Sequence, residues 1–593
     1  MLSSIGIIKK VFPLKIVIEI YNLDQLNQNY KGDVYRCNGV DDYIIVHKSL
    51  HEKYLYQITG LYEEEKPFNK ETESKFISTA YFEATPIGSL INGKFEYGLS
   101  SYPLFGTEVY MVSEDIFNCI FKTKGVYNIK LGSLTNKPEF YPSINIDSLF
   151  SSHISILGNT GSGKSTTVRK LIDEVDRMVK KNKIKKENVN FFIFDVHNEY
   201  NNIGENSKTI EIDDISIPTN LLSLDDWLNL VMPSTLTQLP LVICALRLGN
   251  LIENNVLGEN SDKIIFAFCA LALYKNQQTD AVGKRTKILS FLEKVDDKKI
   301  NEAAKKYNSQ FGNLLPNDEK EFKSSIESYL EANDQAGFNY LTLNQHLEKC
   351  EYSINSLYNL QNYIELALCL EESKGNNQLR SHCSNLQIRI QNLITNYGGN
   401  LFSDNEEKRQ NFENFLNHNE VSFLILNCSF LENEDLNFLV SFILNQIYLR
   451  AKNNNCSRQL YNFIFDEAHK YISEKQSLNE YNSIKTFEKI SREGRKFGIF
   501  MIVASQRAAE LSKTVLSQCN NFILHRIRNN IDLEQIRKSI PYISDSQIYR
   551  ISFLKTGNAL VVGEAFKIPL ELCIEEVENE SSATILATNT WNE

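Results

Sequence analysis

The chain has 593 residues, more than one hydrophobic core usually fills, so we expect two to four structural units. Its 42 % hydrophobic and 23 % charged residues are typical of a soluble globular protein. The sequence has no uncharged apolar run long enough to predict a membrane span. The formal net charge of −11 argues against a protein that wraps nucleic acid with its whole surface, although a local basic channel is compatible with it. The 11 cysteines are dispersed without zinc-type spacing, which favours the reducing cytoplasm.

The amino-terminal region, residues 1–140, carries short β-branched and aromatic runs separated by Gly, Pro, Asn and Asp. Several strands at such spacing are typical of a small β-barrel or a sandwich. We expect its strands at IGIIKKVF, LKIVIEIY, DYIIVHK, KYLYQITGLY, ISTAYFEA and TEVYMV.

Two segments, 145–215 and 416–575, contain near-continuous apolar runs that alternate with helical patterns. Such runs suit strands buried on both faces of a parallel sheet, so we predict one α/β domain built from both segments. Its expected strands are HISILG, VNFFIFD, SFLILNCS, YNFIFDE, GIFMIVASQ, NFILHR and NALVVG.

Residues 216–415 have apolar spacing of the helical type and are predicted to form a helical insertion in this domain. We interpret the Asn-, Lys- and Glu-rich stretches near 300–340 and 400–415 as exposed loops or helix connections. The tail, 576–593, is small and polar and is expected to be weakly ordered.

A phosphate-binding loop follows the first predicted core strand. GNTGSGKS at 158–165 matches GxxxxGK[ST], with an apolar strand before it and a helix after it. Lys164 is expected to neutralise the β- and γ-phosphates of ATP, and the Ser165 hydroxyl to hold Mg²⁺. The predicted nucleotide contacts are Gly158, Asn159, Thr160, Gly161, Ser162, Gly163, Lys164, Ser165 and Thr166.

A second motif, YNFIFDEAHKY at 461–471, supplies adjacent carboxylates after an apolar run. We assign Asp466 to the metal and Glu467 to the attacking water. About 300 residues separate this motif from the loop, and the strands VNFFIFD and SFLILNCS lie between them in the sequence. That separation predicts an extra strand between the two nucleotide motifs, the arrangement of RecA-like ATPases.

Two further polar segments are candidates for the nucleotide cleft. In FDVHNEY, the side chains of Asp195, His197 and Glu199 would share a face if the segment were extended; a polar strand end is the alternative. Gln506 ends a buried strand, where it could sense a γ-phosphate or position water.

Arg492 and Arg495 would share one helix face, and their planar cations suit a transition-state role; a solvated charged surface is the alternative. The basic runs RMVKKNKIKK and GKRTK lack interleaved aromatic residues, so they identify no base-reading element.

Together these motifs resemble the HerA family of hexameric DNA-translocating ATPases, within the larger HerA/FtsK group. The region GKFEYGLSSYPLFGTEVY resembles the small β-barrel of that family. Asn198 stands where the family often has glycine. The matching core segments are ILGNTGSGKST (156–166), DVHNEY (195–200), FIFDEAHKY (463–471), SREGRKFGIFMIVASQR (491–507) and GNALVVGEAFKIP (557–569).

The resemblance implies a homo-hexameric ring with ATP between subunits and DNA in the channel. Glu467 would be the catalytic glutamate, and Arg492 or Arg495 an arginine finger that reaches the next subunit. Relatives work with a separate effector in DNA end processing or antiviral defence, so a nuclease or a sirtuin-like partner is expected. The alternative hypothesis is a hexameric scaffold or sensor in which ATP binding activates a defence effector and translocation is secondary.

Overall fold

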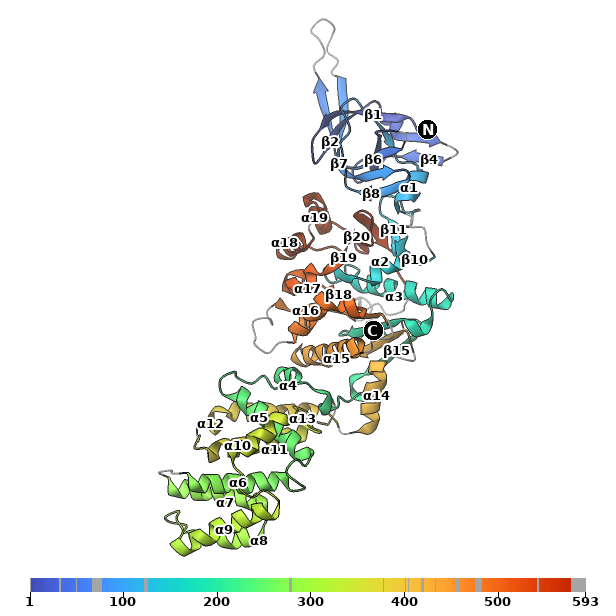
Figure 1. The fold of residues 1–593 in the computed structure, drawn as a ribbon. Coiled ribbons are helices and arrows are strands. Elements are labelled where there is room, and N and C mark those ends of the chain that lie inside the picture. The colour runs from blue at the N-terminus through green and yellow to red at the C-terminus, as the bar shows by residue number, and fades with distance from the viewer. Residues whose placement is uncertain are drawn as a thin grey trace, which may run out of the picture. The chain divides into compact units, whose positions relative to one another are not determined.

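A computed structural model describes residues 2–577 of the chain, apart from 31–32, 50, 67–76, 122–125, 202, 277–279, 377, 400, 404, 418–420, 432, 454–458, 475–482 and 541–542. The chain divides into two units (Figure 1). The first contains 1–209, 418–478 and 484–593, and the second contains 210–417 and 479–483. The predicted tail from residue 578 onward lies outside the described residues.

The amino-terminal strands close into a six-stranded barrel, in the order β2-β1-β9-β5-β6-β7, with β2 paired back to β7. Alternating side chains from these strands fill the interior, with Ile5, Ile18, Ile44 and Tyr56 all fully buried. The predicted barrel is therefore confirmed, and β8 (Lys94–Tyr97) extends its sheet beyond β7. The barrel strands are β1 (Ser4–Val11), β2 (Ile16–Ile20), β5 (Tyr43–His47), β6 (Glu52–Lys66), β7 (Ile77–Ile91) and β9 (Glu108–Met111).

The rest of the first unit is built on a ten-stranded sheet with the order β11-β21-β20-β19-β13-β18-β17-β14-β16-β15. The six strands from β19 to β16 are parallel, and their buried runs carry the predicted apolar sequences. The strands are β11 (Gly132–Leu134), β13 (His153–Leu157), β14 (Asn190–Asp195), β15 (Ser207–Glu211), β16 (Phe423–Asn427), β17 (Tyr461–Phe465), β18 (Ile499–Ser505), β19 (Cys519–Leu524), β20 (Asn558–Gly563) and β21 (Leu570–Ile574).

Helices cover this sheet. The apolar face of α3 (Lys164–Lys180), including Val168 and Leu171, packs in one cluster with Ile154 and Ile156 of β13. This packing fixes the start of α3 against the end of β13, where the phosphate loop lies. Other helices of the unit are α1 (Glu114–Phe121), α2 (Ile146–Phe150), α15 (Asn433–Asn453), α16 (Ile484–Glu493), α17 (Lys513–Ser517), α18 (Asn530–Ser539) and α19 (Asp545–Ser552).

Two expectations about the sheet need correction. The strand NALVVG, now β20, runs antiparallel to β19, so it extends the sheet instead of joining its parallel part. An extra strand does separate β13 from β17, as predicted, but it is β18, which follows both motifs in the sequence. β14 and β16, which lie between the motifs in the sequence, are placed beyond β17.

The second unit is helical in its described residues. The expectation of exposed loops or helix connections near 300–340 and 400–415 holds only for the segments between helices, because α9 (Pro316–Ala332) and α14 (Glu406–Asn417) occupy much of these stretches and α10 (Tyr340–Lys349) begins where the first one ends. Of its 17 residues α9 buries three, Phe322, Ile326 and Leu330, so its sequence is mostly polar. The remaining helices are α4 (Leu224–Val231), α5 (Gln238–Glu253), α6 (Ser261–Lys275), α7 (Ala281–Val295), α8 (Lys298–Ala304), α11 (Leu357–Ser373), α12 (Leu379–His382) and α13 (Ser384–Tyr397).

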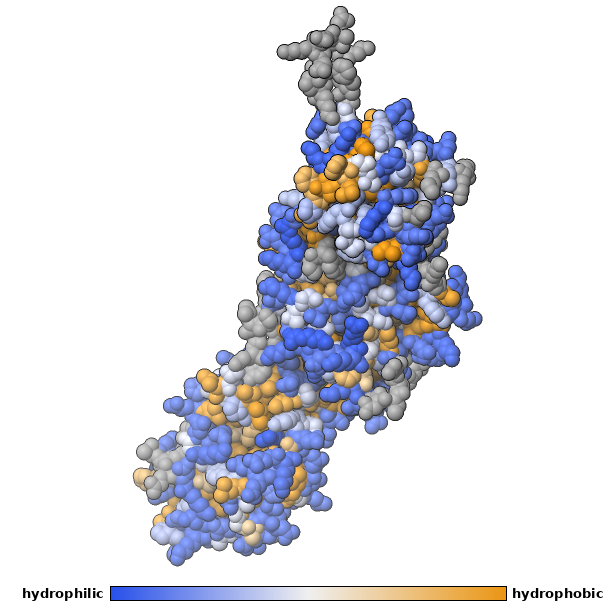
Figure 2. Space-filling view, turned by 45° about the horizontal axis from the view of Figure 1, so that its top comes forward, coloured by the Kyte–Doolittle hydropathy of each residue, from blue (hydrophilic) through white to orange (hydrophobic). Residues whose placement is uncertain are grey.

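No helix within the described ranges is long and apolar enough to cross a membrane. On the face drawn in Figure 2, hydrophobic side chains are interspersed with hydrophilic ones.

Candidate nucleotide site

The phosphate loop connects β13 to α3. Gly161 and Gly163 have φ values of +69° and +115°, which side chains rarely tolerate. A Cβ on Gly158 would lie 2.5 Å from the Cβ of His525, so only glycine fits there. The loop therefore keeps its backbone close to the start of α3, where free N–H groups favour an anion.

The side chains at the start of α3 face the loop. Lys164 is only 7 % exposed, its Nζ lies 3.4 Å from the carbonyl oxygen of Asn159, and burial lowers its pKa. Ser165 is half-buried beside the hydroxyl of Tyr200, a fully buried tyrosine, and Thr166 is half-buried as well. These positions suit the predicted contacts, whose roles remain predictions.

The paired carboxylates lie at the carboxyl end of β17. Burial raises the pKa of Asp466 to about 7, with further contributions from the charges of Glu467, Glu199 and Asp195. Burial also opposes ionisation of Glu467, but contact with His469 and the charge of Lys164 lower its pKa overall. The site thus concentrates negative charge around one buried lysine.

Glu467 has an unusual backbone. Its φ of 44° is left-handed, a conformation that is uncommon for residues other than glycine, and the turn directs the chain into the short helix that carries His469. The Nδ1 of His469 lies 3.3 Å from Glu467 Oε2 and 3.2 Å from the Oγ of Ser505, the last residue of β18. His469 thus contacts both the carboxylate of Glu467 and the end of β18.

The segment after β14 turns instead of extending, so its three polar residues do not form one extended face. Both carboxylate oxygens of Asp195 accept backbone N–H groups, from His197 at 3.2 Å, Glu199 at 3.0 Å and Tyr200 at 2.8 Å. Asn198 adopts a φ of 57°, which asparagine tolerates better than most residues, so the family's glycine is not required. Asp195 organises the loop, and Glu199 contributes charge near Asp466.

Gln506 follows β18 directly and reaches the phosphate loop. Its Oε1 accepts the hydroxyl of Thr160, and both residues line a shallow cleft with Asn159 and Arg507. The structure thus brings Gln506 to the loop, as its position at the strand end predicts.

The two arginines lie elsewhere. Arg492 lies in the last turn of α16 and Arg495 follows that helix, so both precede β18, whose carboxyl end is next to the loop. A strand of this length spans about 20 Å, which separates these exposed guanidinium groups from the phosphate loop of their own subunit. The structure does not bring them together within one chain.

His525, at the end of β19, was not among the predicted site residues. It is fully buried under the phosphate loop, with Nε2 2.7 Å from Thr167 Oγ1 and Nδ1 3.0 Å from the carbonyl oxygen of Asn558. A carbonyl can only accept, so Nδ1 donates to it and Nε2 accepts the Thr167 hydroxyl. The only sequence signal was a histidine ending an apolar run, because its partners lie far away in the chain.

A second buried histidine, His153, joins β13 to neighbouring segments. Its Nδ1 accepts the Met501 N–H at 3.0 Å, and Nε2 lies 3.1 Å from the carbonyl oxygen of Ser491, to which it donates. Burial lowers the pKa of His153 and of His525 from 6.5 to about 4. Both imidazoles are therefore neutral in the folded protein at neutral pH.

The stability of the first unit should decrease as the pH is lowered through a defined window. Below about pH 6.5 the unfolded chain protonates both histidines, whereas the folded protein does so only near pH 4. Stability from these groups is complete above pH 6.5 and is lost as the pH falls toward 4. From pH 7.5 to pH 5, we expect the free energy of unfolding to drop by about 2 kcal/mol per histidine.

Urea unfolding at both pH values measures this loss. His525→Asn and His153→Asn should each reduce the pH dependence, whereas His51→Asn, an exposed control, should leave it unchanged. Equal pH dependence in all four proteins would contradict the assignment.

Comparison with known proteins finds relatives of the helicase HerA. A family model described as the central domain of helicase HerA matches residues 129–335. A probable helicase of Methanocaldococcus jannaschii is 24 % identical over 590 residues, covering 96 % of this chain and 94 % of that protein. The chain is therefore similar to helicases of the HerA type. It is an ATP hydrolase of the P-loop class.

Other similarities are more local or more distant. The DNA double-strand break repair helicase HerA of Sulfurisphaera tokodaii is 27 % identical over 162 residues, covering 26 % of this chain and 32 % of that one. Among solved structures, VirB4 of Thermoanaerobacter pseudethanolicus matches with a TM-score of 0.41 and 15 % identity, over 77 % of this chain and 98 % of that chain.

Proposed function

We propose that this HerA-type ATPase is a DNA translocase or helicase that hydrolyses ATP between the subunits of a hexameric ring. One observation carries the proposal. The phosphate loop, Glu467 and Gln506 meet at the carboxyl ends of the parallel strands, whereas Arg492 and Arg495 lie before the amino end of β18. Such a half-site needs a neighbouring subunit. The family relationship to DNA double-strand break repair helicases supports DNA as the partner.

Mg²⁺ fits the residues that the site offers. The Ser165 hydroxyl and the Asp466 carboxylate are hard oxygen donors of the kind that Mg²⁺ prefers. The pKa of Asp466 is raised by burial and, to a lesser extent, by the charges of Glu467, Glu199 and Asp195, and a divalent cation would offset that neighbouring negative charge. When bound, the ion would neutralise phosphate charge; Ser165 and Asp466 would hold it.

The chain's own residues have separate tasks in this proposal. Lys164 places a cation against the phosphates, and Glu467, ionised and held by His469, accepts a proton from the attacking water. Gln506, already bonded to Thr160, senses the γ-phosphate end. The proposal also gives the ring a separately encoded effector, a nuclease or a sirtuin-like protein, that acts in DNA end processing or antiviral defence.

The test is ATP hydrolysis with and without duplex DNA. We expect DNA to stimulate the wild-type protein, and Lys164→Ala to lower the rate at least about 100-fold because a preorganised cation is lost from the phosphates. Lys180→Ala, which removes an exposed lysine at the far end of the same helix, paired with the buried Asp176, is the matched control and should retain activity. A purified ring that neither binds DNA nor responds to it would refute the translocase proposal.

A further inference from the structure

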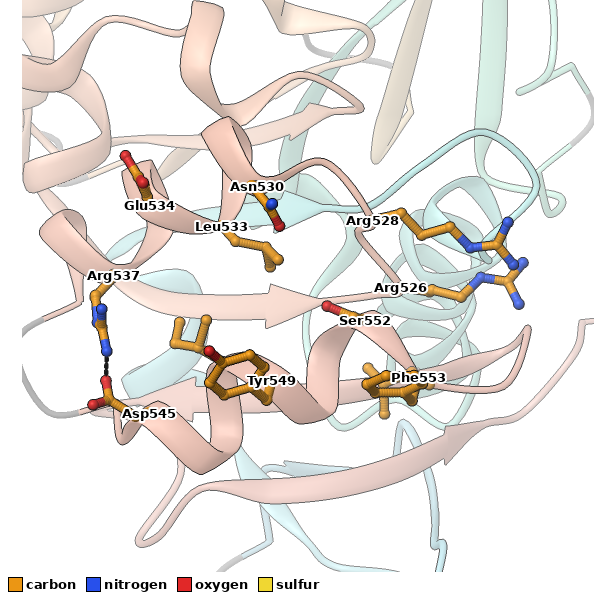
Figure 3. Close-up of a pocket in the computed structure, with 12 residues that line it drawn as sticks. Arg526, Arg528, Asn530, Leu533, Glu534, Arg537, Asp545, Tyr549, Ser552 and Phe553 are labelled. Atoms are coloured by element: carbon orange, nitrogen blue, oxygen red, sulfur yellow. Dashed lines mark ion pairs between the residues drawn. The ribbon is translucent and has the colours of Figure 1, made fainter.

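A cleft of about 800 Å³ lies beside the phosphate loop, between α18 and α19 (Figure 3). This volume falls within the range of small-molecule sites in proteins. None of the residues predicted from the sequence lines it.

The cleft is joined to the phosphate loop at two points. The Asn159 N–H donates to the carbonyl oxygen of Arg526 at 2.9 Å, and Arg526 lines the cleft. The Gly557 N–H donates to the carbonyl oxygen of Ser162 at 3.1 Å, three residues after Leu554, which also lines it. A ligand seated in the loop is therefore next to the cleft.

The strand order sets the direction in which a bound nucleotide must run. β18 and β17, which carry Gln506 and Glu467, flank β13 on one side, so the γ-phosphate end faces that side. β19 and β20 flank β13 on the other side, and the cleft is built on the segments that follow β19. The base and ribose, at the opposite end of the nucleotide, face this second side.

The chemistry of the cleft suits a nucleoside. The guanidinium groups of Arg526 and Arg528 make no hydrogen bond or ion pair with any described residue, and they lie together at one end. Tyr549 and Phe553, four residues apart, are 71 % and 75 % exposed and lie between these arginines and the Arg537–Asp545 ion pair at the other end (Figure 3). Exposed aromatic rings beside free cations are suited to stacking on a base next to phosphate.

We propose that this cleft holds the base and ribose of the nucleotide bound at the phosphate loop, with Tyr549 and Phe553 against the base. The inference rests on the proposed function, because it needs a triphosphate in the loop. It adds the nucleoside end of the site, which the loop motif leaves undefined. The free arginines supply positive charge at the end nearest the phosphates.

The experiment compares two ligands of the full-length protein by calorimetry: ATP and inorganic tripolyphosphate, which lacks the base and ribose. Tyr549→Ala and Phe553→Ala should weaken ATP binding about 5- to 150-fold, the range for one stacked base, and leave tripolyphosphate binding unchanged. Both side chains are largely exposed, so folding should be retained. Phe311→Ala, an exposed phenylalanine of the helical unit, is the matched control.

Two calorimetric results overturn the inference. If both variants bound ATP and tripolyphosphate equally less tightly, the two aromatic side chains would only support the loop. If ATP binding were unchanged, they would not belong to the nucleotide site. Unchanged ATP binding together with lost single-stranded DNA binding would assign the cleft to nucleic acid bases instead. A wild-type protein that binds neither ligand would refute the nucleotide site itself, so the two failures are distinguishable.

Discussion

Glu467→Gln should lower the kcat for ATP hydrolysis by about 100- to 10,000-fold while ATP still binds, because a positioned general base contributes that much. The contacts with His469 and Lys164 lower the pKa of the carboxylate, so it is ionised at neutral pH and ready to accept a proton. The amide keeps the shape but cannot accept that proton. Steady-state hydrolysis and calorimetric ATP binding, measured on the same preparation, test both halves of the expectation.

The control is Glu474→Gln, which alters a more exposed carboxylate in the same segment, paired with Lys513. It should hydrolyse ATP at the wild-type rate. If Glu467→Gln retained more than about a tenth of the activity, the base would have to be another member of the acidic group, and Glu199 would be the next residue to vary.

The same variant separates the two functional hypotheses. In a motor, the effector's activity depends on turnover, so Glu467→Gln should abolish it together with DNA movement. In a scaffold, ATP binding alone sets the ring's conformation, so the effector should remain active. Coupled assays of hydrolysis and effector output therefore decide between translocase and sensor.

The sequence predicted the parts of the site that are local in the chain. The phosphate loop needs only a strand, glycines and a helix in succession, so its position follows directly from 158–165. Asp466 and Glu467 are likewise the end of one apolar run. The barrel was also predictable, because each of its strands alternates or is short and bounded by turn residues.

Features that depend on contacts between distant segments were not predictable. That β18 separates β13 from β17 reflects packing across the whole sheet, since this strand comes after both motifs. His525 meets Thr167 across 358 positions of sequence. The turn at Asn198 depends on the Asp195 carboxylate, which accepts three backbone N–H groups. The alternation of polar residues in the sequence does not reveal this arrangement.

Arg492→Ala or Arg495→Ala should reduce ATP hydrolysis by about 1,000-fold or more, the contribution of an arginine finger, although neither side chain reaches its own phosphate loop. Arg492 lies 3.5 Å from Glu488 on the exposed end of α16, so its removal leaves no buried charge unpaired and the fold should persist. Lysine is not an adequate replacement because it lacks the planar fork, so Arg492→Lys should also be impaired. Arg177→Ala, which removes a half-exposed arginine of α3, is the matched control.

Mixed rings show whether the arginine acts on the neighbouring subunit. Lys164→Ala subunits carry an intact arginine and Arg492→Ala subunits an intact loop, so at equal proportions about a quarter of the interfaces in a closed ring combine both intact halves. Hydrolysis should reappear on mixing and peak near equal proportions, whereas each variant alone stays inactive. If verified mixed rings recover no hydrolysis with either arginine variant at any ratio, the arginines do not complete the site of a neighbouring subunit. The placement of the loop and the arginines at opposite ends of the parallel strands would then need another explanation.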